Sequence, residues 1–192
     1  MTESPPDKST LRRLARARRL AVPAAERRRA AQAAARAALR LIGRRPCCVA
    51  LYLESGSELS TAPLRRALWA AGHRVVVPAI LPGHRLRFHA LTAASRLRRG
   101  AMDIREPCQR RPVPLSAIEV LILPLLAVDA AGTRLGAGGG YYDRLLARCR
   151  GRRRPLRVGY AYAVQQLPTI PREPWDVPLQ ALVTERGILR FS

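Results

Sequence analysis

Asp129 to Leu146 read DAAGTRLGAGGGYYDRLL, and this stretch decides the fold. Glycines stand at positions 136, 138, 139 and 140, between a short apolar run and a pattern typical of a helix. Glycine tolerates positive φ and lets a ligand approach the backbone closely. A run of free N–H groups that leads into a helix N-terminus binds phosphate readily. The stretch therefore predicts a strand, a phosphate-binding loop and a helix in succession.

The residues that follow the glycines add further chemistry. Tyr141 and Tyr142 offer flat aromatic surface, and Asp143 offers a carboxylate that can hold a metal ion. Phosphate, ring and metal together indicate a nucleotide-using enzyme. Two other phosphate loops are excluded, because a Walker loop needs Lys and Ser or Thr after its last glycine and the Rossmann fingerprint needs glycine where Tyr141 stands. The alternative is a turn that uses glycine for geometry alone, although four glycines exceed what one turn needs.

Outside this stretch, the hydrophobic period alternates between that of helices and that of strands. Pro23 suits the first turn of a helix. Thr61 can cap another helix at its N-terminus, and Gly72 can end it. Residues 92–114 show no clear pattern and are expected to form loops and turns. The predicted helices are 8–19, 23–42, 61–72 and 141–149, and the predicted strands are 47–53, 74–80, 86–91, 119–126, 156–162 and 181–185.

Strands that alternate with helices predict an α/β fold with a mainly parallel sheet, covered by helices on both faces. The chain has 192 residues, which suits one domain with a substantial core. We expect residues 1–7 to form a flexible tail and residues 8–192 to form the single domain. Ligands in such folds bind at the carboxyl ends of strands. The glycine stretch follows a predicted strand and so lies in that position.

The net charge of +22 is unusual, and its source is arginine, because Lys8 is the only lysine among 35 basic residues. Such a field attracts any polyanion, including nucleic acid, acidic headgroups and phosphorylated or polycarboxylate substrates. A biased composition explains the charge better than a dedicated nucleic-acid role, since the basic residues are spread along the whole chain. We therefore expect nucleic acid to bind only through non-specific charge.

The cysteines and the apolar runs bear on the compartment. Cys47, Cys48, Cys108 and Cys149 show no metal-ligand spacing, and they are expected to be free thiols in a reducing cytosol. No secretory signal pattern opens the chain. The longest apolar run, 120–128, is interrupted by proline and is too short to cross a bilayer. These observations predict a cytoplasmic protein with no membrane partner.

Four segments, in order, resemble the 5-formyltetrahydrofolate cyclo-ligase family, whose members are also called methenyltetrahydrofolate synthetases. They are RLGAGGGYYDRLL, KSTLR, ALYLESGSELST and VGYAYAVQQLPTIPREPWDVPLQALVTERGIL. The resemblance implies a three-layer α/β/α sandwich. It also implies ATP-dependent ring closure of 5-formyltetrahydrofolate to 5,10-methenyltetrahydrofolate, with magnesium, and with release of ADP and phosphate. In that scheme the formyl oxygen is phosphorylated first, and the phosphate then leaves as the ring closes.

The resemblance also assigns roles to residues. It implies catalytic roles for Lys8, Arg134 and Tyr142. The family's loop often carries a basic residue between its glycines, where this chain has Ala137 and Gly139, and this difference puts more weight on Lys8, Arg12 and Arg134. Without the resemblance, Lys8 and Arg12 fit a solvated helix face. The ATP-binding residues implied are Lys8, Ser9, Thr10, Leu11, Arg12, Arg134, Leu135, Gly136, Ala137, Gly138, Gly139, Gly140, Tyr141 and Tyr142.

Asp143 and Asp176 match the family's magnesium positions, and Mg²⁺ often takes one or two carboxylates plus phosphate oxygens. Alternatively, Asp143 complements a helix dipole and Asp176 makes a turn before a proline. Glu58 matches the folate-binding acid, since a carboxylate can accept the paired N–H donors of a pterin; otherwise it is an exposed loop acid. The implied folate-binding residues are Leu53, Glu58, Ala137, Gly138, Gly139, Gly140 and Tyr141.

The expected partners are thus small molecules, 5-formyltetrahydrofolate and ATP, and the size of family members favours a monomer. Two alternatives stay open at this point. One is a basic nucleic-acid-binding protein, although only 5% of residues are aromatic and no recognition motif interleaves with the charge. The other is a different phosphoryl- or acyl-transfer enzyme on a related α/β fold.

Overall fold

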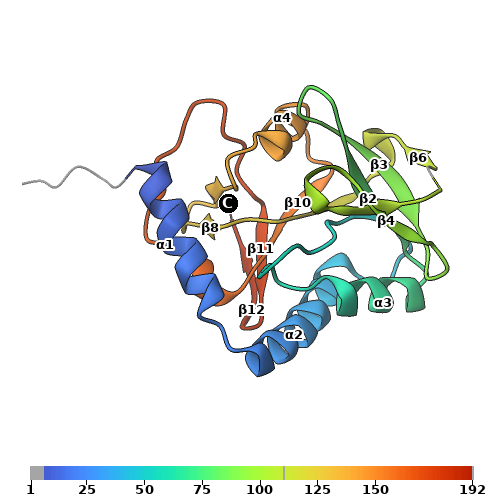
Figure 1. Ribbon diagram of the computed structural model, residues 1–192, viewed down its shortest axis with the longest axis horizontal. Helices are drawn as coiled ribbons and strands as arrows, with labels where there is room; N and C mark the ends of the chain where they lie inside the picture. Colours follow the sequence, from blue (N-terminus) through green and yellow to red (C-terminus); the bar gives the residue numbers. More distant parts are fainter. Residues whose placement is uncertain (1–6, 110, 192) are drawn as a thin grey trace, which may run out of the picture.

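The computed structural model describes residues 7–109 and 111–191, so most of the expected tail at 1–7 lies outside the described residues. An eight-stranded sheet forms the centre (Figure 1). Its strands, in spatial order, are β12 (Gly187–Arg190), β11 (Ala181–Thr184), β10 (Leu156–Tyr160), β7 (Val120–Leu123), β1 (Cys48–Ala50), β2 (Arg74–Leu81), β3 (Arg85–Leu91) and β6 (Pro112–Val113).

The five central strands, β11 to β2, run parallel to one another, which confirms the prediction of a mainly parallel sheet. Both edges are antiparallel: β3 and β6 extend the sheet beyond β2, and β12 turns back on β11. The last strand, β12, was not predicted. A hairpin needs only a tight turn, whereas parallel neighbours need a crossover. Hydrophobic period does not show which of these connections a strand uses.

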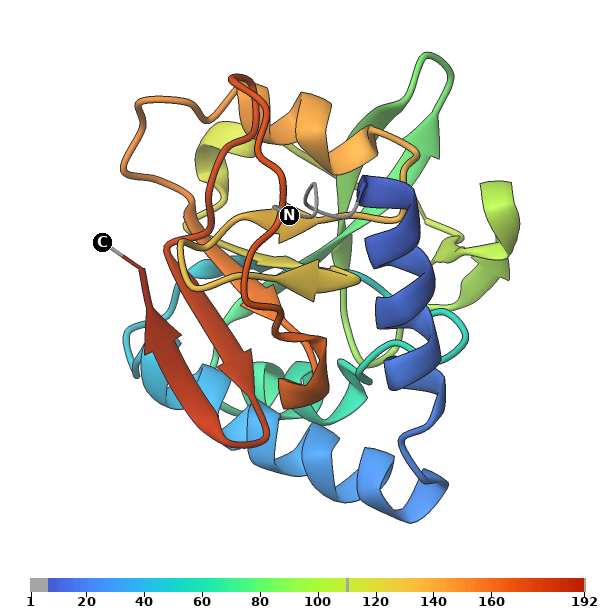
Figure 2. The ribbon, with the colours of Figure 1, turned by 90° about the vertical axis from the view of Figure 1, so that its left-hand side faces the viewer.

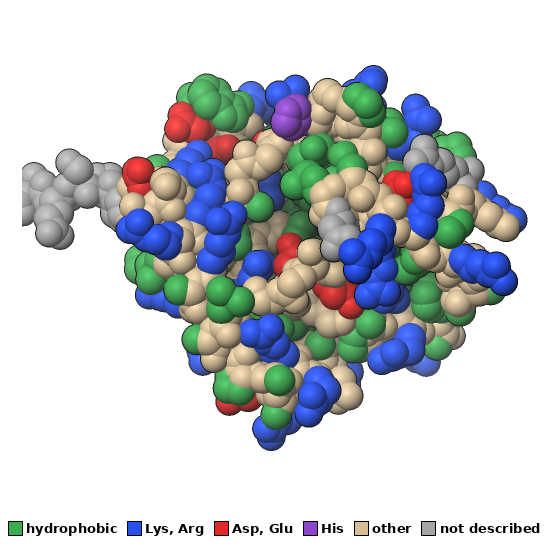
Figure 3. Space-filling model, viewed as in Figure 1, with side chains coloured by type: hydrophobic (Ala, Val, Ile, Leu, Met, Phe, Trp, Pro, Cys, Tyr) green, Lys and Arg blue, Asp and Glu red, His purple; other side chains and the backbone are tan. Residues whose placement is uncertain are grey.

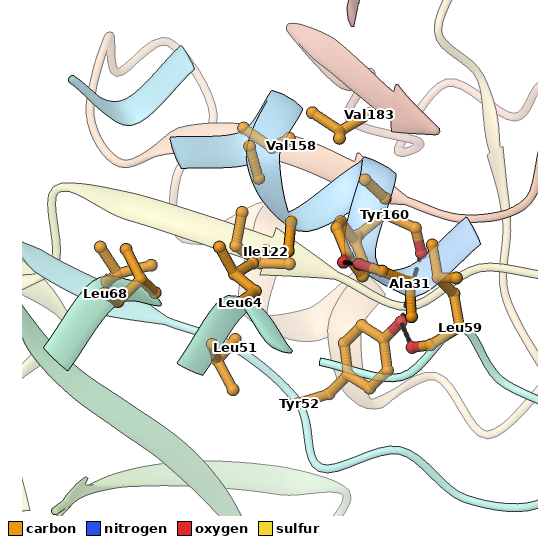
Figure 4. Close-up of a cluster of buried hydrophobic side chains, with 14 of the residues drawn as sticks. Ala31, Leu51, Tyr52, Leu59, Leu64, Leu68, Ile122, Val158, Tyr160 and Val183 are labelled. Atoms are coloured by element: carbon orange, nitrogen blue, oxygen red, sulfur yellow. Dashed lines mark hydrogen bonds between the residues drawn. The ribbon is translucent and has the colours of Figure 1, made fainter. Parts of the chain in front are cut away.

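Two helices cover one face of the sheet, α2 (Ala24–Ile42) and α3 (Ala62–Ala70) (Figure 1). The buried side of α2 consists of alanines, so the helix axis can lie close to the strands. Figure 4 shows the core on this face, where Leu64 and Leu68 of α3 pack toward Leu51 and Ile122. Here Tyr52 Oη donates to the Leu59 carbonyl (2.8 Å).

The opposite face is covered by the short helix α4 (Tyr141–Ala147), whose Leu145 and Leu146 are buried against the sheet. Helix α1 (Lys8–Leu20) lies to one side (Figure 2). Its Leu11 and Ala15 pack with Leu135 and Ile170, next to a small hairpin of β8 (Ala127–Val128) and β9 (Arg134–Leu135). Helices on both faces confirm the expected three-layer α/β/α arrangement.

Several element boundaries differ from the predictions. The segment 119–126 is a strand only at Val120–Leu123, because Pro124 has no N–H to donate. Pro23 is the residue before α2 rather than its first helical residue. Thr61 precedes α3 but its side chain makes no capping bond, because Thr61 Oγ1 accepts from Arg65 Nη1 (2.9 Å) instead of from a helix N–H. The predicted capping bond at Thr61 is therefore wrong.

The stretch 92–114 contains more structure than expected. A separate hairpin of β4 (Leu97–Arg99) and β5 (Arg105–Pro107) flanks a single turn at Ala101–Asp103, and a second such turn at Leu115–Ala117 leads into β7. One further turn, Ala163–Gln165, follows β10. Among the described residues, no helix is both long enough and apolar enough to cross a membrane.

Candidate active site

A cavity of about 250 Å³ opens at the carboxyl ends of β1, β2 and β7. It lies in the hollow near the middle of the face in Figure 3. Apolar side chains of Pro78, Ile80 and Leu86 form part of its wall. The glycine loop, residues 136–140, forms another part, and Glu58 lines the same cavity. This position is where ligands bind in sheets with parallel strands.

In the glycine loop, several carbonyl groups accept hydrogen bonds from side chains, whereas the backbone N–H groups of 138–140 have no acceptor among the described residues. Arg12 Nε donates to the Gly136 carbonyl (3.0 Å), and Arg16 Nη2 lies 3.5 Å from the Ala137 carbonyl. Within the described residues, the N–H groups of 138, 139 and 140 donate no hydrogen bond. Gly138 (φ +103°) and Gly140 (φ +70°) adopt left-handed conformations that favour glycine. The loop therefore presents unpaired donors, as an anion site requires.

A buried arginine anchors the start of α4. The side chain of Arg134 is only 4% exposed, and its guanidinium pairs with the Asp143 carboxylate, which is 49% exposed. The same guanidinium donates to the Pro124 carbonyl (3.3 Å) and lies 5.8 Å from the ring centre of Tyr142. A buried charge without a partner is costly, so the pair holds Asp143 at the cavity edge. Burial raises the pKa of Tyr142 well above its ordinary value, so its hydroxyl stays protonated at neutral pH.

A second ion pair lies at the start of α1. Lys8 Nζ lies 3.0 Å from Asp176 Oδ2 and 3.9 Å from Glu173 Oε1. The Asp176 Oδ2 atom also accepts the Glu173 N–H (2.9 Å). Asp7 caps α1 by accepting the Thr10 N–H (2.7 Å), which sets the first turn that carries Lys8. The structure thus brings together Lys8, to which the resemblance assigned ATP binding, and Asp176, to which it assigned the magnesium ion.

Glu58 is a partly buried carboxylate of the cavity lining. Its Oε2 accepts the Ser55 N–H (3.0 Å). Burial raises the pKa of Glu58, and the Ser55 hydrogen bond and the nearby Arg19 cation oppose that rise. Arg19 in turn donates from Nε to Ser57 Oγ (2.9 Å), which ties α1 to the loop that carries Glu58.

Apart from the Lys8–Asp176 pair and Arg12, which are described above, the residues named from sequence fall into three groups. Ser9 and Thr10 are exposed beside Lys8 and Arg12 on α1, outside the cavity lining. The side chains of Leu11 and Leu135 are buried together in the core, so only their backbone atoms can reach a ligand. The cavity is lined by Leu53, Glu58, Arg134, Gly136, Ala137, Gly138, Gly139, Gly140, Tyr141, Tyr142 and Asp143.

Sequence reasoning missed Arg16 and Arg19, which also line the cavity. The signal was present, because Lys8, Arg12 and Arg16 recur every four residues and so share one helix face. It also missed His84, whose Nδ1 lies 2.9 Å from the Gly139 carbonyl. No pattern in the sequence indicates that contact.

Comparison with known proteins agrees with this geometry. The 5-formyltetrahydrofolate cyclo-ligase family matches residues 4–185. The cyclo-ligase of Escherichia coli K12 is 42% identical over 140 residues, covering 71% of this chain and 76% of that protein. The cyclo-ligase of Mycolicibacterium smegmatis is 31% identical over 196 residues, covering 97% of this chain and 98% of that protein.

Solved structures show the same likeness. The 5,10-methenyltetrahydrofolate synthetase of Aquifex aeolicus superposes with a TM-score of 0.80 at 32% identity, covering 95% of this chain and 92% of that chain. The synthetase of Mycoplasma pneumoniae shares the fold, with a TM-score of 0.76 at 23% identity, covering 94% and 99%. Because the match extends over nearly the whole sequence, this chain belongs to the 5-formyltetrahydrofolate cyclo-ligase family, and it is an enzyme of the ligase class.

Proposed function

We propose that this chain catalyses the ATP- and Mg²⁺-dependent closure of 5-formyltetrahydrofolate to 5,10-methenyltetrahydrofolate, with release of ADP and phosphate. One observation carries the proposal: a single cavity is lined both by a partly buried carboxylate, Glu58, and by a glycine loop with unpaired N–H groups. The first suits a pterin and the second suits a phosphate. Their shared cavity would bring the two reactants together, which is the main task in phosphoryl transfer.

The folate is proposed to enter with its pterin toward Glu58. The carboxylate can accept the 2-amino and ring N–H donors in a paired, charge-assisted arrangement. The buried side chain of Leu53 and the apolar wall of Pro78, Ile80 and Leu86 match the flat, largely apolar body of the ligand. The formyl end would then lie toward the glycine loop.

The triphosphate is proposed to lie along the glycine loop, held by its amides and by nearby cations. The loop itself contains no basic side chain. Arg12 and Arg16 reach its carbonyls from α1, and the Arg134 guanidinium lies against Gly136. Together with Lys8, these cations can neutralise the charge that would otherwise fall to a basic residue within the loop.

In the first step the formyl oxygen attacks the γ-phosphorus, the bond to the β-phosphate oxygen breaks, and ADP leaves. In the second step N10 attacks the activated formyl carbon and loses its proton, and the phosphate leaves with the C–O electron pair. The product is the methenyl cation. No strong general base is needed, because phosphorylation activates the electrophile. Tyr142, with its raised pKa, can donate a hydrogen bond to phosphate but cannot act as a base.

The acidic residues suit a magnesium ion that is shared with the nucleotide. Within the described residues, no cluster of three or more Asp, Glu, His or Cys side chains could hold a metal by itself. Asp143 and Asp176 each bond through one oxygen, to Arg134 and to Lys8 respectively, and keep the other oxygen available. Mg²⁺ is commonly held by one or two carboxylates with phosphate oxygens, and it would neutralise charge on the triphosphate.

The test is spectrophotometric. Purified protein is mixed with 5-formyltetrahydrofolate, ATP and Mg²⁺, and the near-ultraviolet absorbance of the methenyl product is followed while ADP is assayed in parallel. We expect equal amounts of both products, and none when ATP or Mg²⁺ is left out. Folded protein that forms no methenyl product over a range of pH and substrate concentration would overturn the proposal.

A further inference from the structure

The turn between β2 and β3 contacts the glycine loop. These strands pair from Val75 with Leu91 out to Leu81 with Arg85, so their turn is held at the end of a long hairpin. His84 lies in this turn, and its Nδ1 lies 2.9 Å from the carbonyl oxygen of Gly139, 55 residues away in the sequence. The hairpin therefore reaches the catalytic loop through one side chain.

A second contact supports the first. The rings of His84 and Tyr141 are tilted by 47°, with 5.2 Å between their centres, a geometry typical of aromatic pairs. The Tyr141 ring also lies tightly against the loop, since a Cβ added at Gly139 would come within 3.1 Å of it. One imidazole thus contacts both the loop backbone and the first residue of α4.

The direction of the hydrogen bond follows from the chemistry of the groups. A carbonyl oxygen can only accept, so His84 Nδ1 carries the proton and donates it. In a trans peptide the C=O of one residue and the N–H of the next point in opposite directions. Holding the Gly139 carbonyl toward His84 therefore turns the Gly140 N–H away from the hairpin. That N–H is one of the unpaired donors of the loop.

We propose that His84 is a positioning residue, which orients the 139–140 peptide of the glycine loop for the triphosphate. It acts through the loop and not on the reacting atoms. The inference rests on the proposed function, because it takes that loop as the phosphate site. The inference adds a second source of order to the proposed site: the β2–β3 hairpin, and not only α1, shapes the glycine loop.

The backbone at His84 provides a matched pair of variants. His84 adopts φ +55°, a left-handed conformation in which Asn and Asp are the best tolerated residues after glycine. His84→Asn keeps an N–H donor, whereas His84→Asp places a carboxylate oxygen against the Gly139 carbonyl. The two variants are almost equal in size and backbone preference, so they differ in the hydrogen bond and in one charge.

The charge difference is controlled by Arg87→Gln. Arg87 is exposed on β3 of the same hairpin, and its loss changes the net charge by the same amount as His84→Asp. We have assigned it no part in binding or catalysis. Melting temperature is measured for every variant, to exclude a general loss of fold.

Two measurements test the inference. In hydrogen–deuterium exchange without ligands, peptides that cover the loop and α4, residues 136–149, should exchange faster in His84→Asp than in the wild-type protein, with little change in His84→Asn or Arg87→Gln. The free loop amides exchange fast in every variant, so the readout is the Arg144 N–H, which bonds to the Gly140 carbonyl, and the α4 amides after it. In steady-state assays, kcat/KM for ATP should fall about tenfold in His84→Asp, the order of one lost hydrogen bond, and by less than about threefold in the other two.

The inference is overturned if His84→Asp and His84→Asn show the same loop exchange and the same ATP kinetics. It is also overturned if Arg87→Gln reproduces the effect of His84→Asp, because charge alone would then be responsible. The exchange experiment needs no turnover. Faster loop exchange in a protein without cyclo-ligase activity would therefore disprove the proposed function while leaving the contact between His84 and the loop intact.

Discussion

Lys8 Nζ and Asp176 Oδ2 lie 3.0 Å apart, although 168 residues separate them in the chain. This ion pair joins the first turn of α1 to the segment that precedes β11. Neither residue lines the cavity beneath the glycine loop. Lys8 instead lies on the same helix as Arg12, which reaches the loop from the next turn. The proposed nucleotide site would therefore extend from the loop toward the start of α1.

Replacing Lys8 by alanine should raise the KM for ATP by about tenfold or more, since a charged hydrogen bond to phosphate is lost. The melting temperature should change little, because an ion pair between partly exposed side chains contributes at most about 1 kcal/mol. Arg13→Ala, an exposed site on the same helix, is the control and should leave the KM unchanged. Wild-type ATP kinetics in Lys8→Ala would remove this residue from the site.

Asp143→Asn should lower kcat by at least about 100-fold and shift the Mg²⁺ requirement to higher concentration, because a neutral amide is a poor magnesium ligand. The fold should persist, since the amide oxygen can still accept from the buried Arg134. Rates are measured across a Mg²⁺ titration. Glu119→Gln, which breaks a surface pair with Arg154, is the control. Full turnover by Asp143→Asn at ordinary Mg²⁺ would contradict the assignment.

Glu58→Gln should weaken folate binding and yet stabilise the free protein near neutral pH. Burial raises the pKa of Glu58 above its ordinary 4.5, so the protonated form is favoured in the folded state. The stability from this group is fully present below pH 4.5 and is lost as pH rises through the folded pKa. Melting temperatures of the two proteins should therefore diverge from pH 4 to pH 7, with the variant higher at pH 7. Equal pH profiles would show that the site leaves this carboxyl unperturbed.

Tyr52→Phe should destabilise the protein by about 1–2 kcal/mol, because the Leu59 carbonyl loses its donor in a buried site. Tyr160→Phe is the matched comparison. Its hydroxyl lies farther from its acceptor, 3.3 Å from the Ala31 carbonyl, and its loss should cost less. Urea unfolding measures both. The reverse order would show that these distances do not rank the two hydrogen bonds.

The order of helices and strands was largely readable from hydrophobic period, because period depends on residues close together in sequence. The helix predicted at 8–19 is observed at Lys8–Leu20, and the strand predicted at 74–80 at Arg74–Leu81. Strand direction was not readable in this way. The antiparallel pairing of β3 with β2 and the added strand β12 depend on how the chain turns back, which period does not encode.

The site shows the same division. The glycine loop could be named from the sequence, because clustered glycines predict backbone conformations that other residues rarely adopt. Gly138 and Gly140 do adopt such conformations. Asp143 could be named from its place after the loop and Arg134 from the family resemblance, but their ion pair could not. Arg19 and His84 reach the site from segments far away in the chain, and only their contacts with Ser57 and Gly139 identify them.

Backbone freedom at glycine and periodic burial depend on neighbouring residues, and they specified the loop and the elements around it. The meeting of α1, the β2–β3 turn and the 171–178 segment depends on packing between residues far apart in sequence. Such contacts form only when the strands have paired in their final order and helices have buried both faces of the sheet. Which cations surround the loop was therefore settled by folding.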